Sequence, residues 1–378
     1  MTTARVLLTG GGSGGHIYPL LAVAQEIKKF AAENQFALDL RYFGPSDAYA
    51  ELVTSAGLKT VNIASGKLRR YFSILNIVDV PKFFLGLCQA LWKVFWFMPD
   101  AVFSKGGTGA LPVVLAAWFY RIPVLIHESD AAPGLTNLVS ARFARRIAVS
   151  FERAAKYFPE SKTALTGNPI RKEFATYQTS EDRAKDELGF NPQKPLLLIL
   201  GGSQGSQRLN EFILTLLKEL LEATQVLHQT GAANFAEVKK LSQAALADIP
   251  LRTEAVSRYD AKPYLDEHYK TALRAADVIV SRAGSNIFEI AAMGKPAVLI
   301  PLAESANDHQ RVNAYEYAKT GAAAVIEEPN LLPGIFVNQI KEMLKNPNLL
   351  AQMSAAAQKF ARPKAAEVIA EEIFRLMA

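Results

Sequence analysis

The chain has 378 residues, of which 50% are hydrophobic and 21% are charged. This composition excludes a disordered chain and a collagen-like protein, and the length is sufficient for two domains that each bury a core. Cys88 is the only cysteine, which excludes an intramolecular disulfide and a zinc site built from several cysteines.

Positive charge is concentrated in the N-terminal half of the sequence. Residues 1–170 carry 18 basic and 11 acidic side chains, whereas the rest of the chain carries 24 and 25. This asymmetry indicates that the N-terminal half meets an anionic partner. The opening MTTARVLLTGGG has no signal-peptide core and no run of 18 uncharged apolar residues occurs, so we expect a cytoplasmic protein without a spanning helix.

Short apolar runs alternate with helix-period segments such as Leu20–Ala32 and Asn210–Leu221. Most of the runs are continuously hydrophobic, which is typical of parallel strands covered on both faces. The sequence therefore predicts doubly wound α/β domains. The predicted strands are Arg5–Thr9, Leu38–Phe43, Ala101–Ser104, Val124–His127, Arg146–Ser150, Leu196–Leu200, Val226–Gln229, Val278–Ser281, Ala297–Ile300 and Ala323–Ile326.

The strand–glycine pattern of the N-terminus restarts in the middle of the chain. The first strand leads into GGGSGGH (10–16), and LLLIL (196–200) leads into GGSQGS (201–206). A polar stretch with three prolines separates the two halves, so we place the domain junction near residue 172. The prediction is a domain over 1–172, a second over 173–361, and an amphipathic helix within 362–378 that can pack on either domain, including back on the first.

Four glycine-rich turns follow predicted strands, at 10–15, 105–112, 201–206 and 281–286. Such turns present bare backbone N–H groups and a positive helix end, which suit a phosphate. One such turn could be purely structural, but four at strand ends favour a phosphate-bearing ligand in a crevice between two domains. The first turn matches G-x-G-x-x-G, yet no acidic residue for a ribose ends the second strand, which disfavours a dinucleotide-dependent oxidoreductase.

Two histidines have surroundings suited to acid–base chemistry. His16 follows the first glycine turn at a predicted helix start, where the positive helix end favours a neutral imidazole that can act as a base. His127 stands beside Glu128 and near Asp130, a second acid–base cluster for which structural hydrogen bonding is an equal alternative.

The sequence gives little support to metal chemistry. The five histidines lack ligand spacing, and no D-x-D pair is present to hold a divalent ion on a diphosphate. We therefore expect no metal and no cofactor. A bound diphosphate would be neutralised by helix dipoles, backbone N–H groups and Arg171 or Arg282.

Seven segments together resemble the MurG family of peptidoglycan glycosyltransferases, the undecaprenyldiphospho-muramoylpentapeptide β-N-acetylglucosaminyltransferases. The resemblance covers almost the whole chain. It implies a GT-B fold of two Rossmann-like domains that face a central cleft. The implied reaction is metal-independent, inverting transfer of GlcNAc from UDP-GlcNAc to the muramoyl sugar of lipid I, giving lipid II. The segments are GGGSGGHIYPLLAVA (10–24), KGGTGALP (105–112), HESDAAPGLTN (127–137), TGNPIR (166–171), LGGSQGSQRLN (200–210), SRAGSNIFEIAAMGKP (281–296) and NDHQRVNA (307–314).

The resemblance also implies roles for individual residues. His16 is the leading candidate for the general base and Glu128 a second catalytic candidate. Tyr264 and Leu265 would hold the uracil, Glu289 the ribose hydroxyls, and His309, Gln310 and Asn313 the GlcNAc hydroxyls. The further donor contacts are Ser13, Gly14, Gly15, Asp130, Arg171, Ser203, Gln204, Arg282, Gly284, Ser285 and Asn286, and the acceptor contacts are Gly106, Gly107, Thr108 and His127.

Three positions depart from the family pattern. Thr108 stands where many members carry Tyr, and Asp130 where Asn is frequent. The segment SRAGSNIFE is one residue shorter before its glutamate, which affects the register of Ser285 and Asn286 but not of Glu289.

Residues 67–98 combine a basic cluster with many aromatic side chains. Charges and a proline interrupt the segment, so it should not span a bilayer, and it is typical of an interfacial anchor. A buried core segment is the alternative. We expect the protein at the cytoplasmic face of the bacterial plasma membrane, with contacts from Lys67, Arg69, Arg70, Phe83, Phe84, Trp92, Phe95 and Trp96.

Other functions remain as alternatives. A different lipid glycosyltransferase, such as one acting on diacylglycerol, would share the donor motifs, but HESD and TGNPIR favour the muramoyl acceptor. Nucleic-acid binding would use the basic half, yet nothing there resembles a recognition module. The expected partners are therefore UDP-GlcNAc, the polyprenyl-diphosphate-linked muramoyl-pentapeptide and an anionic membrane surface, without nucleic acid.

Overall fold

The computed structural model describes residues 3–45, 49–66, 76–107, 109–202, 205–247 and 258–377. The chain divides into two compact units. Unit 1 comprises Met1–Lys172 together with Arg362–Ala378, and unit 2 comprises Glu173–Ala361. Each unit is built on a parallel β-sheet between helices, as the continuously hydrophobic strands predict.

The sheet of unit 1 has its strands in the order β3-β2-β1-β4-β5-β6-β7, and all neighbours are parallel. The order runs outward from β1 in one direction and from β4 in the other, so the topological switch point lies between β1 and β4. The strands are β1 (Thr3–Gly11), β2 (Ala37–Gly44), β3 (Lys59–Asn62), β4 (Ala101–Gly107), β5 (Val124–Glu128), β6 (Arg146–Val149) and β7 (Thr163–Leu165).

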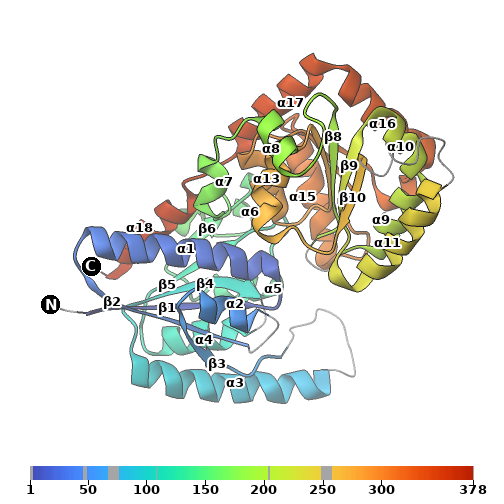
Figure 1. Cartoon of the computed structure of the whole chain (residues 1–378). Coiled ribbons are helices and arrows are strands. Elements are labelled where there is room, and N and C mark those ends of the chain that lie inside the picture. Colours follow the sequence, from blue (N-terminus) through green and yellow to red (C-terminus); the bar gives the residue numbers. More distant parts are fainter. Residues whose placement is uncertain are drawn as a thin grey trace. The chain divides into compact units, whose positions relative to one another are not determined.

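Helices cover both faces of this sheet. Figure 1 shows α1 and α18 along one face and α3 with α4 along the other. The core on the α1 side is apolar throughout, with Val6, Leu8, Ile17, Leu20 and Ile27 fully buried. The helices are α1 (Gly14–Glu33), α2 (Ala50–Ser55), α3 (Asn76–Phe97), α4 (Ala110–Phe119), α5 (Leu135–Ser140), α6 (Glu152–Ala155) and α18 (Ala365–Met377).

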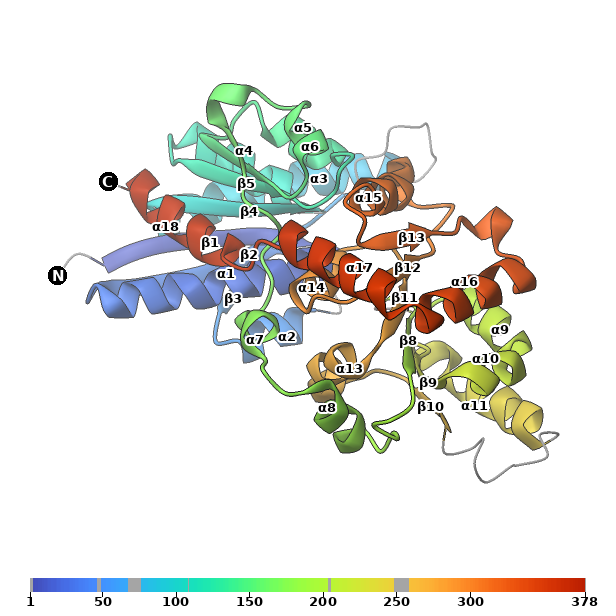
Figure 2. The same cartoon turned by 90° about the horizontal axis from the view of Figure 1, so that it is seen from above.

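The C-terminal helix α18 belongs to unit 1 and packs along α1 (Figure 2). Phe374 stacks on Phe30 of α1 with ring centroids 4.5 Å apart, and Glu372 forms an ion pair with Arg146 of β6 at 2.8 Å. The amphipathic pattern after Pro363 thus produces a helix whose apolar face completes the core of unit 1. The rest of that core comes from residues far earlier in the sequence.

Unit 2 repeats the architecture with the strand order β10-β9-β8-β11-β12-β13, again all parallel. Its switch point lies between β8 and β11. The strands are β8 (Leu196–Leu200), β9 (Gln225–Gln229), β10 (Tyr259–Lys262), β11 (Val278–Ser281), β12 (Ala297–Leu299) and β13 (Ala323–Val325).

One core of unit 2 lies between its sheet and α9, α10, α11 and α16, where Ile213, Leu217, Phe336 and Ile340 are buried. Figure 1 shows these four helices together on one side of the sheet. The helices are α8 (Glu181–Glu187), α9 (Gln207–Thr215), α10 (Leu217–Ala223), α11 (Ala232–Ala247), α13 (Tyr269–Ala275), α14 (Asn286–Ala292), α15 (His309–Ala318), α16 (Pro333–Lys345) and α17 (Pro347–Phe360), with α7 (Lys172–Thr176) at the junction of the units.

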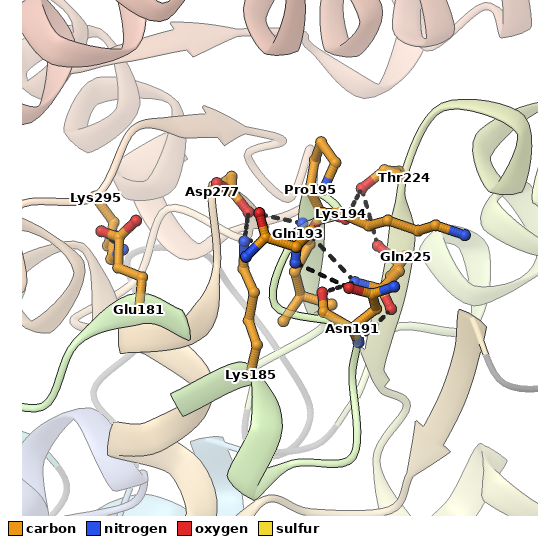
Figure 3. A network of polar contacts seen from close by, with 11 residues as sticks. Glu181, Lys185, Asn191, Gln193, Lys194, Pro195, Thr224, Gln225, Asp277 and Lys295 are labelled. Atoms are coloured by element: carbon orange, nitrogen blue, oxygen red, sulfur yellow. Dashed lines mark hydrogen bonds and ion pairs between the residues drawn. The ribbon is translucent and has the colours of Figure 1, made fainter. Parts of the chain in front are cut away.

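A polar network ties α8 and the following loop to unit 2 (Figure 3). The buried Lys185 pairs with Asp277 at 2.8 Å, and the buried Lys295 pairs with Glu181 at 2.6 Å. The Gln225 side chain accepts from Asn191 N and donates to Asn191 O, at 2.8 and 2.9 Å. The polar, proline-rich stretch of the sequence is therefore ordered by contacts with the second sheet.

All ten predicted strands are confirmed, with ends that differ by a few residues at most. Three strands, β3, β7 and β10, were not predicted because they are short, partly exposed edge strands without an apolar run. The predicted helix 210–221 is two helices, α9 and α10, separated at Leu216. Among the described residues, no helix is long and apolar enough to cross a membrane.

Candidate functional site

The four glycine turns lie at the two topological switch points. The turns after β1 and β4 flank the switch point of unit 1, and the turns after β8 and β11 flank that of unit 2. In open α/β sheets the loops at the carboxyl ends of the strands bind the ligand at this place, because adjacent connections leave in opposite directions. Each unit therefore has one candidate binding site.

In unit 1 the two glycine turns pack directly against one another. Gly11, Gly12, Gly106 and Gly107 all have positive φ angles, a region that other residues rarely adopt. A Cβ atom on Gly107 would clash with the carbonyl oxygen of Gly11 and lie 3.2 Å from the ring of His16. Gly107 is therefore required for the close approach of the two turns. Thr108, from the same predicted acceptor set, lies outside the described residues.

His16 lies in the first turn of α1, beside the first glycine turn, and is half-buried. The Oγ atom of Ser13, the N-cap residue of α1, is 2.9 Å from His16 Nδ1. This hydrogen bond orients the ring, so that its Nε2 atom faces away from Ser13. The structure thus brings together Ser13, Gly14, Gly15 and His16 at one helix end.

His127, at the end of β5, is completely buried. Its Nε2 atom is 2.9 Å from the carbonyl oxygen of Gly167, in TGNPIR, and the pKa of the imidazole is well below its ordinary value because of burial and the nearby Lys105. The carbonyl acceptor places the proton on Nε2. His127 is therefore held as a neutral imidazole inside unit 1.

Glu128 is also buried, and three donors hold its carboxylate. Asp130 N, Gly134 N and Asn137 Nδ2 donate at 2.9, 3.1 and 2.9 Å. Burial, and then the neighbouring Asp130, raises the pKa of Glu128 to about 6. A carboxyl group with this pKa can exchange a proton near neutral pH, as an acid–base group requires. The side chain of Asp130 is half-exposed at the same turn.

Lys105, which sequence reasoning missed, lies between these groups and the first glycine turn. It is 1% exposed, and a Cβ on Gly10 would lie 3.3 Å from the Lys105 Cβ. The signal in the sequence is a lysine that ends an apolar strand at a glycine turn, in FSKGG (103–107).

In unit 2, Arg282 connects the two glycine turns. Its guanidinium donates to Ser206 Oγ at 2.6 Å, to Glu328 Oε1 at 2.5 Å and to Ile300 O at 3.0 Å. Both Arg282 and Glu328 are almost fully buried, so the positive charge of Arg282 is compensated within the protein. Its position therefore favours a role in holding the turns together. Ser203 and Gln204 lie outside the described residues.

The turn before α14 is arranged by two asparagines. Asn286 Nδ2 donates to Ser281 Oγ at 2.5 Å, and the buried Asn313 of α15 donates to Ala283 O at 3.2 Å. Ser285 is the N-cap residue of α14, a helix of seven residues, and has a helical conformation. Asn313 thus acts on the backbone of the turn. The half-exposed Glu289 lies in the first turn of α14.

The remaining predicted donor residues occupy loops and helix starts of unit 2, with one exception. Tyr264 is exposed, as a ring that stacks on a ligand must be. The adjacent Leu265 is buried, which fixes its backbone. His309 and Gln310 begin α15, and Gln310 Oε1 accepts from Leu302 N at 3.0 Å. The exception is Arg171, which belongs to unit 1 and lies 5.5 Å from the ring of Tyr18.

The aromatic segment forms α3, and several of its large side chains are exposed. Trp92 is 65% and Trp96 69% exposed, and Phe84 and Phe95 are exposed as well, whereas Phe83 is half-buried and Phe97 is buried. The end of α4, which packs on α3, adds two exposed rings that sequence reasoning missed, Trp118 and Phe119. We call the exposed rings of α3 and α4 the aromatic surface. Lys67, Arg69 and Arg70 lie outside the described residues.

In the part of the chain that the structure describes, no cluster of three or more His, Cys, Asp or Glu side chains is arranged to hold a metal ion.

Two domain families match the two halves of the chain. Residues 6–149 match the glycosyltransferase family 28 N-terminal domain, and residues 196–369 match the glycosyltransferase family 28 C-terminal domain. With two parallel sheets and glycine turns at both switch points, these matches define a glycosyltransferase of the GT-B class.

Named relatives narrow this class. The UDP-N-acetylglucosamine–N-acetylmuramyl-(pentapeptide) pyrophosphoryl-undecaprenol N-acetylglucosamine transferase 2 of Bacillus cereus is 34% identical over 98% of this chain and 99% of that protein. The transferase of the same name from Clostridium kluyveri is 35% identical over 97% of this chain and 98% of that protein. The chain belongs to this family of N-acetylglucosamine transferases.

Solved structures agree with this assignment. The crystal structure of Acinetobacter baumannii MurG superimposes with a TM-score of 0.75 and 26% identity, covering 98% of this chain and 99% of that one. A UDP-GlcNAc 2-epimerase from Neisseria meningitidis, solved with UDP-GlcNAc, has a TM-score of 0.67 at 14% identity over 98% and 100% of the chains, which shows the shared fold alone.

Proposed function

We propose that the protein transfers GlcNAc from UDP-GlcNAc to the muramoyl-pentapeptide of undecaprenyl-diphosphate-linked lipid I and so forms lipid II. The observation that carries this proposal is the full-length similarity to transferases named for this reaction. The glycine turns at both switch points supply the phosphate-binding backbone that a nucleotide sugar and a lipid diphosphate require.

The chemistry is a displacement at the anomeric carbon of GlcNAc. The acceptor hydroxyl oxygen forms a bond to C1 while the bond from C1 to the UDP oxygen breaks, and the hydroxyl proton passes to a base of the protein. Inversion follows from attack on the face opposite UDP. His16 is the leading base because it is half-exposed and oriented by Ser13, whereas His127 is enclosed and already holds Gly167 O. Glu128 is the second candidate.

Most donor contacts are assigned to unit 2, and the further donor contacts Ser13, Gly14, Gly15, Asp130 and Arg171 belong to unit 1. Tyr264 would stack on the uracil, and the carboxylate of Glu289 would accept hydrogen bonds from the ribose hydroxyls. The turns that Arg282 and Asn313 hold in place would direct backbone N–H groups at the diphosphate. The acceptor is assigned to Gly106, Gly107 and Thr108 of unit 1. His127, which was predicted with them, is buried and bonded to Gly167 O, so we assign it an indirect role through its neighbours.

We propose that the reaction needs no metal ion. The absence of a D-x-D pair from the sequence supports this proposal, because that pair is a usual ligand of a divalent ion on a diphosphate. Transfer should therefore continue in EDTA once cation effects on lipid presentation are controlled. Activity lost in EDTA and restored by stoichiometric Mg²⁺ or Mn²⁺ would contradict the proposal.

We further propose that unit 1 docks on the cytoplasmic face of the bacterial plasma membrane through the aromatic surface. Exposed Trp and Phe rings in a segment that a basic cluster precedes in the sequence are typical of a protein that lies in the membrane interface. A polyprenyl-linked acceptor requires such an approach, and the excess of basic residues in the N-terminal half favours an anionic membrane.

The decisive experiment is transfer of labelled GlcNAc to a lipid I analogue, with diacylglycerol as the competing acceptor. Product formed on the muramoyl acceptor supports the proposal, and product formed only on diacylglycerol would replace it. A thermal-shift series separates the donors, because a ligand that binds only the folded state raises its stability. UDP-GlcNAc should raise the melting temperature more than UDP-glucose, and NADH should not raise it.

A further inference from the structure

Lys105 occupies a central position in unit 1 that the assignments above do not use. The pairing of β4 with β5 ends at Ser104 and Ile126, so Lys105 and His127 follow at the carboxyl ends of two neighbouring strands. A Cβ atom on Gly106, the next residue of β4, would lie 2.6 Å from Asn137 Oδ1, and Asn137 donates to Glu128 Oε2 at 2.9 Å. Lys105 is therefore buried beside the segments that carry His127 and Glu128.

The ammonium group of Lys105 has no hydrogen-bond partner among the described residues, although it is buried. The two other strongly buried lysines differ, since Lys185 and Lys295 each form an ion pair with a carboxylate, at 2.8 and 2.6 Å. A buried amine without a direct partner is costly, so it needs a reason other than packing. Within the described part of the chain, the Nζ atom of Lys105 and the Nδ1 atom of His127 are both buried and both without a hydrogen-bond partner.

The nearest charges explain how the amine acts on its surroundings. Burial lowers the pKa of Lys105 to about 8, opposed by Glu128 and Asp130, so the group is mostly charged at pH 7. Lys105 in turn lowers the pKa of Glu128, against the larger effects of burial and Asp130, and lowers that of His127.

Lys105, His127 and Glu128 form a buried cluster, on which other groups also act. His16, at the start of α1, adds to the lowering at His127, while α5 contributes the neutral Asn137 and β6 leads into the neutral Ser150. Lys105 is therefore the cation of the cluster at neutral pH, where His127 is held uncharged.

We infer that Lys105 is a positioning residue of the transfer reaction, whose buried ammonium group acts electrostatically on the neighbouring Glu128 without contacting either substrate. The inference rests on the proposed function, because it requires Glu128 to take part in the reaction. It assigns to the lysine of the second glycine turn an electrostatic task, distinct from phosphate binding by the backbone of the same turn.

The test is the pH profile of kcat/KM for the full-length Lys105→Met variant, which keeps the aliphatic stem and removes the charge. Lys105 lowers the pKa of Glu128, so the acid limb should move to higher pH when its charge is removed. The KM for UDP-GlcNAc should stay at the wild-type value. Lys162→Met is the matched control, because Lys162 is a lysine of unit 1 whose ammonium group, among the described residues, donates to the backbone carbonyls of Ala141 and Ala144. Its profile should coincide with that of the wild type.

The Glu128→Gln variant identifies the group that titrates, because the acid limb should disappear from its pH profile of kcat/KM. An acid limb that disappears in Glu128→Gln but stays in place in Lys105→Met would overturn the inference while leaving the role of Glu128 intact. An acid limb that persists in Glu128→Gln would overturn both. If Lys105→Met does not fold, Lys105→Gln provides a neutral polar replacement with the same expected shift.

A readout without turnover separates the inference from the proposed function. In ¹³C NMR of protein labelled at the glutamate carboxyl groups, the signal missing from Glu128→Gln reports Glu128. Its midpoint should move to higher pH in Lys105→Met, because an opposite charge is lost. An unchanged midpoint would overturn the inference, whether or not the wild type transfers GlcNAc. A wild type that transferred no GlcNAc would contradict the proposed function alone.

Discussion

At the scale of single residues, burial separates side chains that look alike in the sequence. His16 and His127 both stand beside glycine or acidic residues, but His16 is half-exposed at a helix start whereas His127 is enclosed and bonded to a backbone carbonyl. Arg282 and Arg171 were both candidates for a diphosphate, yet Arg282 is paired with Glu328. His16 and Arg171 can meet a substrate, whereas the ring of His127 and the guanidinium of Arg282 already bind groups of the protein.

The first prediction at this scale concerns the donor. Glu289→Ala should weaken UDP-GlcNAc binding by about 1.5–3 kcal/mol, because a charge-assisted hydrogen bond to the ribose is lost. Isothermal titration calorimetry measures this as a roughly ten- to hundredfold higher Kd. Glu222→Ala is the control, since Glu222 is an exposed glutamate of the same unit. A folded Glu289→Ala protein with the wild-type Kd would remove Glu289 from the donor site.

The second concerns proton transfer. His16→Ala should lower the single-turnover rate roughly 10²–10⁴-fold with little change in donor affinity, because the base is lost while the donor contacts in unit 2 remain. His268→Ala, which removes an exposed histidine, should transfer at the wild-type rate. If His16→Ala also transfers at the wild-type rate, the base is another group, and Glu128 is the next to test.

At the scale of elements, the direction of a side chain around its helix decides its environment. Trp96 and Phe97 are neighbours in α3, but consecutive residues point about 100° apart, so Trp96 is exposed while Phe97 packs on Phe43. The aromatic segment is consequently neither all core nor all surface. Helix α3 uses one face to cover the sheet and presents the other outward.

The aromatic surface leads to the third prediction. Trp92→Ser/Trp96→Ser should reduce co-flotation with vesicles that contain anionic lipid, because two rings that would enter the interface are lost. Lys67/Arg69/Arg70→Glu should reduce it further and remove its salt dependence, since each basic residue near such a surface contributes about 1 kcal/mol.

The matched control for this experiment is Leu332→Ser/Ile335→Ser, which removes two exposed apolar side chains from unit 2. Flotation should be unaffected by it. All variants should retain near-normal turnover on a short-chain soluble acceptor. Equal flotation of wild type and the tryptophan variant at low salt would show that the aromatic surface does not meet the membrane.

The fourth prediction concerns the attachment of α8. Lys185→Met should destabilise unit 2 by about 1–3 kcal/mol, because Asp277 loses its buried cationic partner but keeps some solvent contact. The expected observation is a lower Tm for unit 2 in calorimetry, with unchanged donor affinity once folded. The exposed pair Lys319–Glu316 provides the control, since Lys319→Met should change Tm little. A larger loss in Lys319→Met than in Lys185→Met would contradict this ranking.

At the scale of the whole molecule, each unit encloses a histidine that must stay neutral. His127 lies in unit 1 and His228 in unit 2, where burial lowers the pKa of His228 to about 3 and Tyr259 and Asn210 bind its ring nitrogens. Glu128 changes the pH dependence of stability in the opposite direction to these histidines. Its pKa in the folded protein is about 6, above the ordinary value of 4.5.

The fifth prediction is acid destabilisation of both units. Between the ordinary pKa of 6.5 and the folded pKa of about 3, the unfolded chain binds a proton at His228 that the folded chain does not. The free energy of unfolding of unit 2 should therefore fall below pH 6.5, by about 1.4 kcal/mol per pH unit from this group. The free energy of unfolding of unit 1 should fall less steeply down to about pH 4.5, because protonation of Glu128 stabilises the folded state in that pH range.

Urea unfolding at pH 7.5, 6.0 and 5.0 measures these slopes. His228→Gln should flatten the slope of the unit 2 transition and leave that of unit 1 unchanged. Equal slopes for unit 2 in wild type and His228→Gln would show that this histidine is not the group that destabilises the unit in acid.

The sequence alone determined the fold class, the strands, the four glycine turns and the order of the family motifs. These features are local, because a continuous apolar run or a glycine after a strand specifies its conformation from a few neighbouring residues. The edge strands β3, β7 and β10 were missed because half-exposed strands of three or four residues carry no such run.

Only the tertiary structure decided which side chains are enclosed and what they bind. Lys105 is buried by segments far apart in the chain, Arg282 meets Glu328 across 46 residues, and α18 returns to the first unit through Phe374 and Phe30. Burial and pairing depend on what packs against a residue rather than on its neighbours in sequence. The same dependence determines the protonation of His127 and Glu128, because it is the surrounding protein that replaces water at these groups.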